Sequence, residues 1–141
     1  PVHIALPSLA QRPVRERIIL VLHFLWREAG LLQKPIYLNQ DLLSAMVHYD
    51  CGANVGQLEN DIRLTCANVY YKFRIGKSSV IRIRLSNLSA EIQQGLLTSR
   101  GASSRLVRET LATAQDAELV IDGELPFQRI LDTYLDAESE G

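Results

Sequence analysis

The sequence has few cysteines, no long apolar run and no leader signal. Its two cysteines, Cys51 and Cys66, are too few for a disulfide framework, and the three histidines stand apart from them. No apolar stretch approaches the roughly 20 residues that span a bilayer, and the first residues lack the features of a signal peptide. We therefore expect reduced thiols in a soluble, cytoplasmic protein. Because the chain begins with Pro1 rather than Met, we also expect a piece of a longer protein.

The compact motifs of common enzymes are also missing. There is no phosphate-binding loop, no dinucleotide fingerprint and no nucleophile elbow. Acidic residues are scattered, and His23 and His48 each fall within a helical pattern without a catalytic partner at a useful spacing. We expect both histidines to serve in packing or local hydrogen bonds. The chain by itself is therefore predicted not to be an enzyme, with no catalytic residue and no metal ligand.

The composition is that of a globular domain. Hydrophobic residues make up 47% of the 141 residues and charged residues 22%, which allows a packed core under a solvated surface. This length fits one domain, or a small domain with an appendage.

Helical periodicity dominates the first half of the chain. A helix is predicted to begin at Pro13 and to end at Gly30, and a second to begin at Asn39 as its N-cap. The clearest pattern belongs to a third helix that Gly76 closes. Its apolar residues recur at steps of three or four: Val55, Leu58, Ile62, Cys66, Val69 and Phe73.

Short strands and further helices complete the predicted fold. Alternating residues predict strands at 2–6 and 80–85, and the apolar residues at 119–121 predict a third short strand. In the second strand, Ile81, Ile83 and Leu85 should share the buried face. Further helices are expected from Ser86 or Ser89 to about Leu97, from Ser103 or Ser104 to about Ala114, and from Pro126 onward. The fold class is mainly α, a small helical bundle with one or two short strands and a helical C-terminal extension.

Charge is divided unevenly between two segments. Residues 62–99 hold six basic residues and one acid, whereas residues 100–141 hold four arginines and nine acids. This division is compatible with a nucleic-acid-binding patch, an acidic interaction surface, attraction between the two segments, or ordinary solvated faces.

Two stretches of sequence resemble a known family. The first runs from Leu6-Pro7-Ser8-Leu9 through Arg12 into the helix with His23-Phe24-Leu25. It resembles the exit from the AAA+ core into the helical lid of bacterial enhancer-binding proteins. The second, Ala53-Asn54-Val55-Gly56-Gln57-Leu58, resembles the opening of the third lid helix. With Gly-Gln-Leu in this opening, the chain most resembles LevR-like, sigma-54-dependent transcriptional activators, over roughly residues 3–98.

The resemblance implies an organisation and a function. Residues 1–12 would end the AAA+ core, residues 13–98 would form the lid, and residues 99–141 would connect to a region of phosphotransferase regulation. The lid would help to close an ATP site and support ATPase-driven activation of transcription. ATP or ADP with magnesium would bind only the full-length ATPase, not this fragment.

Partners and site residues follow from the same resemblance. The partners implied are sigma-54 RNA polymerase, promoter or enhancer DNA through other domains, phosphotransferase proteins, and further copies in a ring. The residues implied to lie at the nucleotide are Asn54, Val55, Gly56, Gln57 and Leu58. Gly56 stands where many relatives carry the sensor II arginine, so this contact would come from backbone N–H groups at a helix start, with Val55 and Leu58 packing on adenine.

Two other functions fit parts of the sequence. A winged-helix DNA-binding domain would have helices and a strand in this order, with Arg63, Lys72 and Arg74 on phosphates. Alternatively, residues 99–141 would form a protein-interaction module with an acidic surface.

Overall fold

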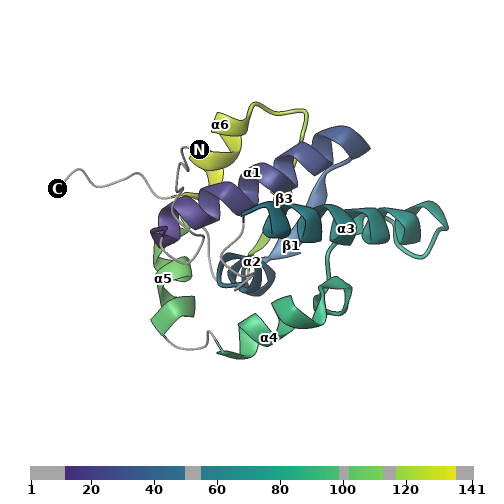
Figure 1. Ribbon diagram of the computed structural model, residues 1–141. Helices are drawn as coiled ribbons and strands as arrows, with labels where there is room; N and C mark the ends of the chain where they lie inside the picture. Colours follow the sequence, from purple (N-terminus) through teal and green to yellow (C-terminus); the bar gives the residue numbers. More distant parts are fainter. Residues whose placement is uncertain (1–11, 50–54, 99–101, 113–116, 136–141) are drawn as a thin grey trace, which may run out of the picture.

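The computed structural model describes residues 12–49, 55–98, 102–112 and 117–135 (Figure 1). Within these ranges the fold is mainly helical, as predicted, and three short strands, instead of the one or two expected, form one small sheet. The elements in chain order are α1 (Val14–Leu32), β1 (Ile36–Asn39), α2 (Gln40–Val47), α3 (Val55–Arg74), β2 (Ile81–Arg82), the 3₁₀ turn η2 (Leu85–Asn87), α4 (Ala90–Thr98), α5 (Ala102–Thr110), β3 (Glu118–Ile121) and α6 (Phe127–Tyr134). The strand predicted at 2–6 lies outside the described residues, as does Cys51.

The sheet has three strands in the order β2-β1-β3. The central strand β1 runs parallel to β2, with Ile36 opposite Ile81, and antiparallel to β3, with Leu38 opposite Leu119. The sequence predicted β2 and β3 but missed β1. Its signal is short: after Pro35, buried Ile36 and Leu38 alternate with half-buried Tyr37. A four-residue alternation of this kind is too brief to separate from a loop.

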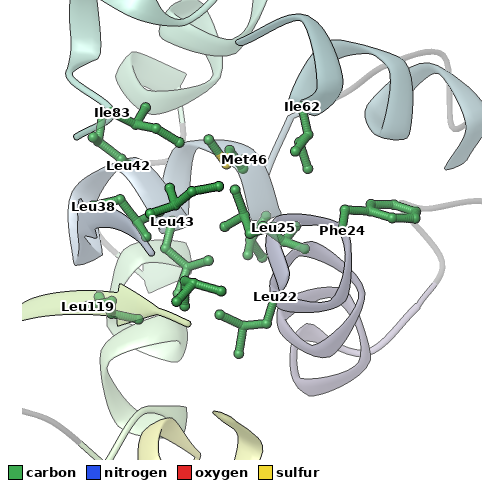
Figure 2. Packing of buried hydrophobic residues seen from close by; sticks show 14 of the residues in the cluster. Leu22, Phe24, Leu25, Leu38, Leu42, Leu43, Met46, Ile62, Ile83 and Leu119 are labelled. Carbon is green, nitrogen blue, oxygen red and sulfur yellow. The ribbon is translucent and has the colours of Figure 1, made fainter. Parts of the chain in front are cut away.

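One hydrophobic core joins all parts of the described chain. Figure 2 shows side chains of α1, β1, α2 and β3 converging, among them Leu22, Leu25, Leu43 and Leu119. The same core includes Val107 of α5, Leu111 directly after α5, and Ile130 of α6. The boundary between residues 98 and 99 stays a prediction, but the elements on its two sides share this core.

Several predicted helix ends are confirmed, including the starts at Pro13 and Pro126. The bounds of the fifth helix are wrong, because α5 covers Ala102–Thr110: Ser103 and Ser104 lie inside it, and it ends before Ala114. Asn39 Oδ1 accepts a hydrogen bond of 2.9 Å from the Leu42 N–H, and Ser89 Oγ accepts one of 3.3 Å from the Ile92 N–H. Gly76 has φ 80° just after α3. However, α1 does not end at Gly30: it continues to Leu32, and Gln33 takes the left-handed conformation with φ 58°.

The predicted strand at 80–85 is correct only at its start. Ile81 and Arg82 pair with β1, and the Ile83 N–H still donates to the Tyr37 carbonyl at 2.8 Å. The chain then turns into η2, because Asn87 Oδ1 accepts from the Arg84 N–H at 2.7 Å. Leu85 consequently lies 43% exposed instead of sharing the buried face with Ile81 and Ile83.

The helices of the described segments are too short or too polar to cross a bilayer.

Candidate functional site

The site predicted from sequence lies at the start of α3. Of the five residues predicted to lie at the nucleotide, Asn54 falls outside the described residues. The other four, residues 55–58, form the first turn of α3. Gly56 and Gln57 are exposed there, and Val55 is half buried against the core. Leu58 is fully buried within that core. It therefore holds the helix in place, and it cannot pack on adenine as the sequence led us to expect. The exposed edge consists of Gly56 and Gln57.

Side chains on two helices anchor this helix start. Arg27 Nη1 of α1 and Glu59 Oε2 of α3 form an ion pair of 2.6 Å. On α3 itself, Gln57 Nε2 donates to Asp61 Oδ1 at 3.2 Å, and Thr65 Oγ1 donates to the Asp61 carbonyl at 2.8 Å. The Arg27–Glu59 ion pair thus links the start of α3 to α1, while the two hydrogen bonds at Asp61 lie within α3.

The electrostatics of the first turn of α3 favour an anion. The turn carries no acidic side chain. The first N–H groups of any α-helix lack carbonyl partners within the helix, and the aligned peptide dipoles leave partial positive charge at this end. The start of α3 therefore carries partial positive charge, and its first turn holds no acidic side chain that would oppose a nearby phosphate group.

His23 lies in an aromatic cluster between α1 and α6. Its ring centroid is 5.1 Å from that of Phe127 and 5.7 Å from that of Trp26. Partial burial lowers the pKa of the His23 imidazole, and the positive Arg27 lowers it further, whereas Glu59 acts in the opposite direction. The neutral ring packs against its neighbours, which is the role that the sequence predicted for it.

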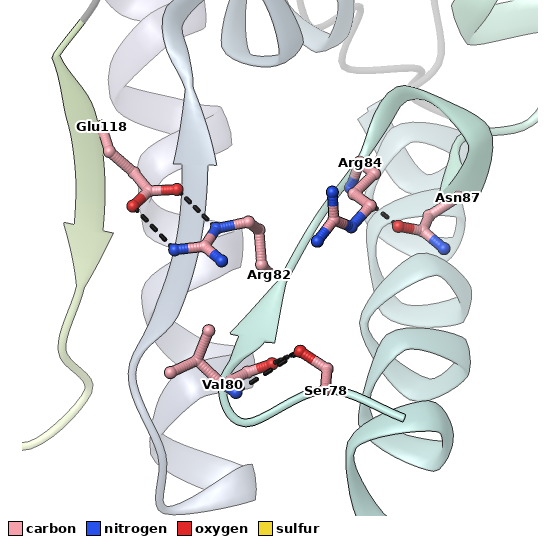
Figure 3. A network of polar contacts seen from close by, with 6 residues as sticks. All are labelled: Ser78, Val80, Arg82, Arg84, Asn87 and Glu118. Atoms are coloured by element: carbon pink, nitrogen blue, oxygen red, sulfur yellow. Dashed lines mark hydrogen bonds and ion pairs between the residues drawn. The ribbon is translucent and has the colours of Figure 1, made fainter. Parts of the chain in front are cut away.

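A polar cleft lies where β2 and β3 flank the end of β1. The cleft measures about 310 Å³, and Asn39, Asp41, Arg84 and Glu118 are among its lining residues. Figure 3 shows Arg82 reaching across β1 to Glu118, with hydrogen bonds of 2.7 and 3.0 Å. These bonds lower the pKa of the Glu118 carboxyl.

The Arg82–Glu118 pair explains part of the uneven charge distribution. Arg82 belongs to the basic segment 62–99 and Glu118 to the acidic segment 100–141, so the two segments attract each other at this point, one of the alternatives left open by the sequence. The sequence could not identify the pair, because the two residues are 36 positions apart. They meet only through the missed strand β1.

Cys66 and the grouping of possible metal ligands are the remaining features to consider in the described residues. Burial raises the pKa of the Cys66 thiol far above its usual value, and Glu28 adds to the rise, so the thiol stays protonated and unreactive. Across the described ranges, no three His, Cys, Asp or Glu side chains are grouped to hold a metal ion.

The strand pairing argues against a winged-helix domain. The order helix, strand, helix, helix, strand is present from α1 to β2. However, β2 and β3 each pair with β1 and not with one another. The β-hairpin that would form a wing after the third helix is therefore not built by the described strands.

Comparisons with known proteins give two informative matches. The transcriptional regulatory protein LevR of Bacillus subtilis (strain 168) is 31% identical over 99 residues, which cover 70% of this chain and 10% of LevR. The transcriptional regulatory protein DagR of Salmonella typhimurium (strain 14028s / SGSC 2262) is 35% identical over 67 residues, which cover 48% of this chain and 7% of DagR. No protein-family model matches the chain, and no solved structure does.

These matches place the chain in the class of transcriptional regulatory proteins. Within that class the chain is LevR-like, in agreement with the resemblance seen in its motifs. The chain spans at most a tenth of the length of these curated relatives.

Proposed function

We propose that residues 13–98 are the lid of an AAA+ ATPase in a sigma-54-dependent, LevR-like transcriptional activator. In this role the chain closes one side of an ATP site that the rest of the protein supplies, and it does not hydrolyse ATP by itself. The observation that carries the proposal is the anchored start of α3, where exposed Gly56 and Gln57 lie in an acid-free first turn. Backbone N–H groups at such a helix end are a common phosphate-binding arrangement.

The wider role follows from the family. In the complete protein, magnesium with ATP or ADP would be the cofactor, and several copies would assemble in a ring. Sigma-54 RNA polymerase and promoter or enhancer DNA would be contacted by other domains. Sugar-phosphotransferase proteins would regulate the activator, with residues 99–141 leading toward that regulatory region. A cytoplasmic location is part of the same proposal.

The test uses the complete regulator that contains this chain and adds one negative charge at the start of α3. Gly56→Glu places a carboxylate where the phosphates are expected, while an acid in the first turn favours the helix itself. Repulsion should weaken ATP affinity or turnover by about tenfold or more. Ala67→Glu is the matched control, because it adds the same charge at an exposed position further along α3.

The outcome is read from ATP affinity, the ATPase rate and circular dichroism. A selective loss in Gly56→Glu, with both variants folded, supports the proposal. If Gly56→Glu retains normal affinity and turnover, or if Ala67→Glu is equally impaired, the start of α3 does not face the nucleotide.

A further inference from the structure

The polar cleft at the strand ends holds charged side chains of both signs. Arg82 and Glu118 are paired with each other, and the Arg82 guanidinium also lies 5.5 Å from the centre of the Tyr37 ring. Asp41, in the first turn of α2, and Arg84, after β2, line the same cleft. Across the described ranges, neither the Asp41 carboxylate nor the Arg84 guanidinium takes part in an ion pair or hydrogen bond, and Figure 3 draws Arg84 bonded only through its backbone. Two opposite charges therefore share this cleft without neutralising each other.

The position of the polar cleft is one at which folds with parallel strands bind small molecules. β1 and β2 run parallel, and the cleft lies beyond their carboxyl ends: Asn39 ends β1, and Arg84 lies two residues after Arg82, the last residue of β2. α2 begins directly after β1, so its first turn also borders the cleft. Ligands of α/β sheets bind in the crevice outside the carboxyl ends of the strands. The cleft has the corresponding place in this small sheet.

One wall of the polar cleft is apolar. Leu42 and Ile83 are buried beneath it, and Leu85 lines it while remaining exposed to solvent. Leu85 lies there because the Arg84 N–H donates to Asn87 Oδ1 and the chain turns into η2. The turn that removes Leu85 from the core therefore gives the cleft an apolar contact surface beside its two free charges.

We propose that the polar cleft binds a small zwitterion, a free α-amino acid with an apolar side chain. Its carboxylate accepts hydrogen bonds from the Arg84 guanidinium, its ammonium group donates to the Asp41 carboxylate, and its side chain packs on Leu85. Arg82 and Glu118 stay paired and form the back of the site. None of the residues that line the cleft belongs to α3, so this site does not depend on the proposed nucleotide role.

The dimensions and the charges of the polar cleft restrict the ligand. Asp41 and Arg84 are farther apart than the roughly 4 Å of a direct ion pair, so a molecule with both charges can lie between them. The volume of about 310 Å³ is at the lower end of small-molecule sites, which measure roughly 300–1,000 Å³. The ligand must therefore be small.

Ligands of a single charge fit the polar cleft less well. Inorganic phosphate would meet the carboxylates of Asp41 and Glu118, and like charges repel strongly at such distances. A divalent cation would meet Arg82 and Arg84 instead, and no three possible metal ligands are grouped within the described residues. A zwitterion satisfies both signs of charge at once.

The test follows the binding of L-leucine to the 141-residue chain by ¹H–¹⁵N NMR. A ligand this small is expected to bind with a Kd of about 1 mM, and the shifted amides should be confined to residues 39–42, 83–85 and Glu118. N-acetyl-leucine lacks the ammonium charge, and leucinamide lacks the carboxylate. Each should bind the parent chain about tenfold more weakly or worse, because a charge-assisted hydrogen bond is lost.

Two variants match these two ligands. Asp41→Asn should weaken leucine binding by about tenfold or more and should bind leucine and N-acetyl-leucine equally, since the ammonium group has lost its partner. Arg84→Gln should likewise bind leucine and leucinamide equally. Asp132→Asn and Arg74→Gln are the matched controls: they remove the same charges at exposed positions outside the cleft and should keep the parent affinity. The NMR spectra also show whether each variant is folded.

Several results would overturn the proposal. One is the absence of localised shifts at leucine concentrations well above the expected Kd. Another is binding of N-acetyl-leucine or inorganic phosphate as tightly as leucine, which would make the cleft an anion site. Binding of leucinamide as tightly as leucine would exclude the contact with Arg84, and equal losses in the variants and their controls would exclude the cleft itself.

Discussion

Two glycines that lie against each other are expected to respond in opposite ways to the same substitution. Gly30 is in the last turn of α1, and Gly123 is in the turn that joins β3 to α6. A Cβ atom added at Gly30 meets only the Gly123 carbonyl oxygen, at 3.8 Å. A Cβ added at Gly123 lies 2.5 Å from Gly30 Cα and 2.6 Å from the Ala29 carbonyl carbon, and closer still to the Gly30 nitrogen. The backbones, not flexible side chains, must then separate.

The expected magnitudes follow from this geometry. Gly30→Ala should stabilise the protein by up to about 1 kcal/mol, because Ala is the better helix residue and the space is open. Gly123→Ala should cost about 3 kcal/mol, at the upper end for overpacking, because two main-chain segments must move. The shift would also strain the neighbouring hydrogen bond of 2.7 Å from Trp26 Nε1 to the Leu125 carbonyl.

Urea and thermal unfolding, followed by far-ultraviolet circular dichroism, measure both effects. Gly123→Ala should lower the melting temperature by roughly 10 °C, and Gly30→Ala should leave it equal or higher. Ordinary surface substitutions change the free energy of unfolding by about 0.5 kcal/mol or less. If Gly123→Ala changes it by no more than this, α1 and the β3–α6 turn are not in close contact. The same conclusion follows if Gly30→Ala is the more damaging substitution.

Three further predictions concern single side chains. Asn39→Ala removes the N-cap of α2 and should cost about 1 kcal/mol in urea unfolding; an unchanged midpoint would contradict the capping role. Because Arg82 lowers the pKa of Glu118 in the folded state, this carboxylate adds stability above its unfolded pKa and loses it as pH falls through the folded value. Glu118→Gln should therefore lower the free energy of unfolding slightly near neutral pH, and this loss should shrink below about pH 4. A loss of stability that grows as the pH falls would refute this role of the Arg82–Glu118 pair. In a Cys51→Ser background, the Cys66 thiol should react with iodoacetamide only after unfolding, because it is buried with a raised pKa; rapid labelling of the native protein would count against the position of α3.

The helices were predictable because their signals are long. The apolar repeat of α3 extends over five turns, so one ambiguous residue does not alter the assignment. Asn39 was also correctly assigned from its residue type, since its side chain is suited to capping. Gly30 was wrongly assigned as the end of α1, because a glycine near a helix end predicts a C-cap. In the structure, Gly30 lies inside α1 and leaves space for the turn at Gly123. That contact joins residues far apart in the chain, and local patterns carry no information about it.

The sheet was only partly predictable, because its strands are paired by contacts between residues far apart in the chain. β1 has four residues, and its place between β2 and β3 depends on tertiary pairing. Without β1, the sequence could not bring Arg82 to Glu118. At the candidate site, the motif located the start of α3, but burial decides which residues are accessible. Leu58 has the apolar character expected of an adenine contact, yet its side chain is fully buried in the hydrophobic core.

Amide hydrogen exchange in the full-length protein tests most directly whether the start of α3 faces a nucleotide. Exchange is measured by mass spectrometry with and without magnesium and ADP. A phosphate bound at the positive end of α3 should slow exchange of the amides in its first turn, most clearly at Val55 and Gln57. The start of α2 is the internal reference, since the Leu42 N–H already bonds to Asn39. Selective slowing in the first turn of α3 is the result we predict; saturating ADP that leaves the Val55 and Gln57 amides unchanged would contradict the proposed lid role.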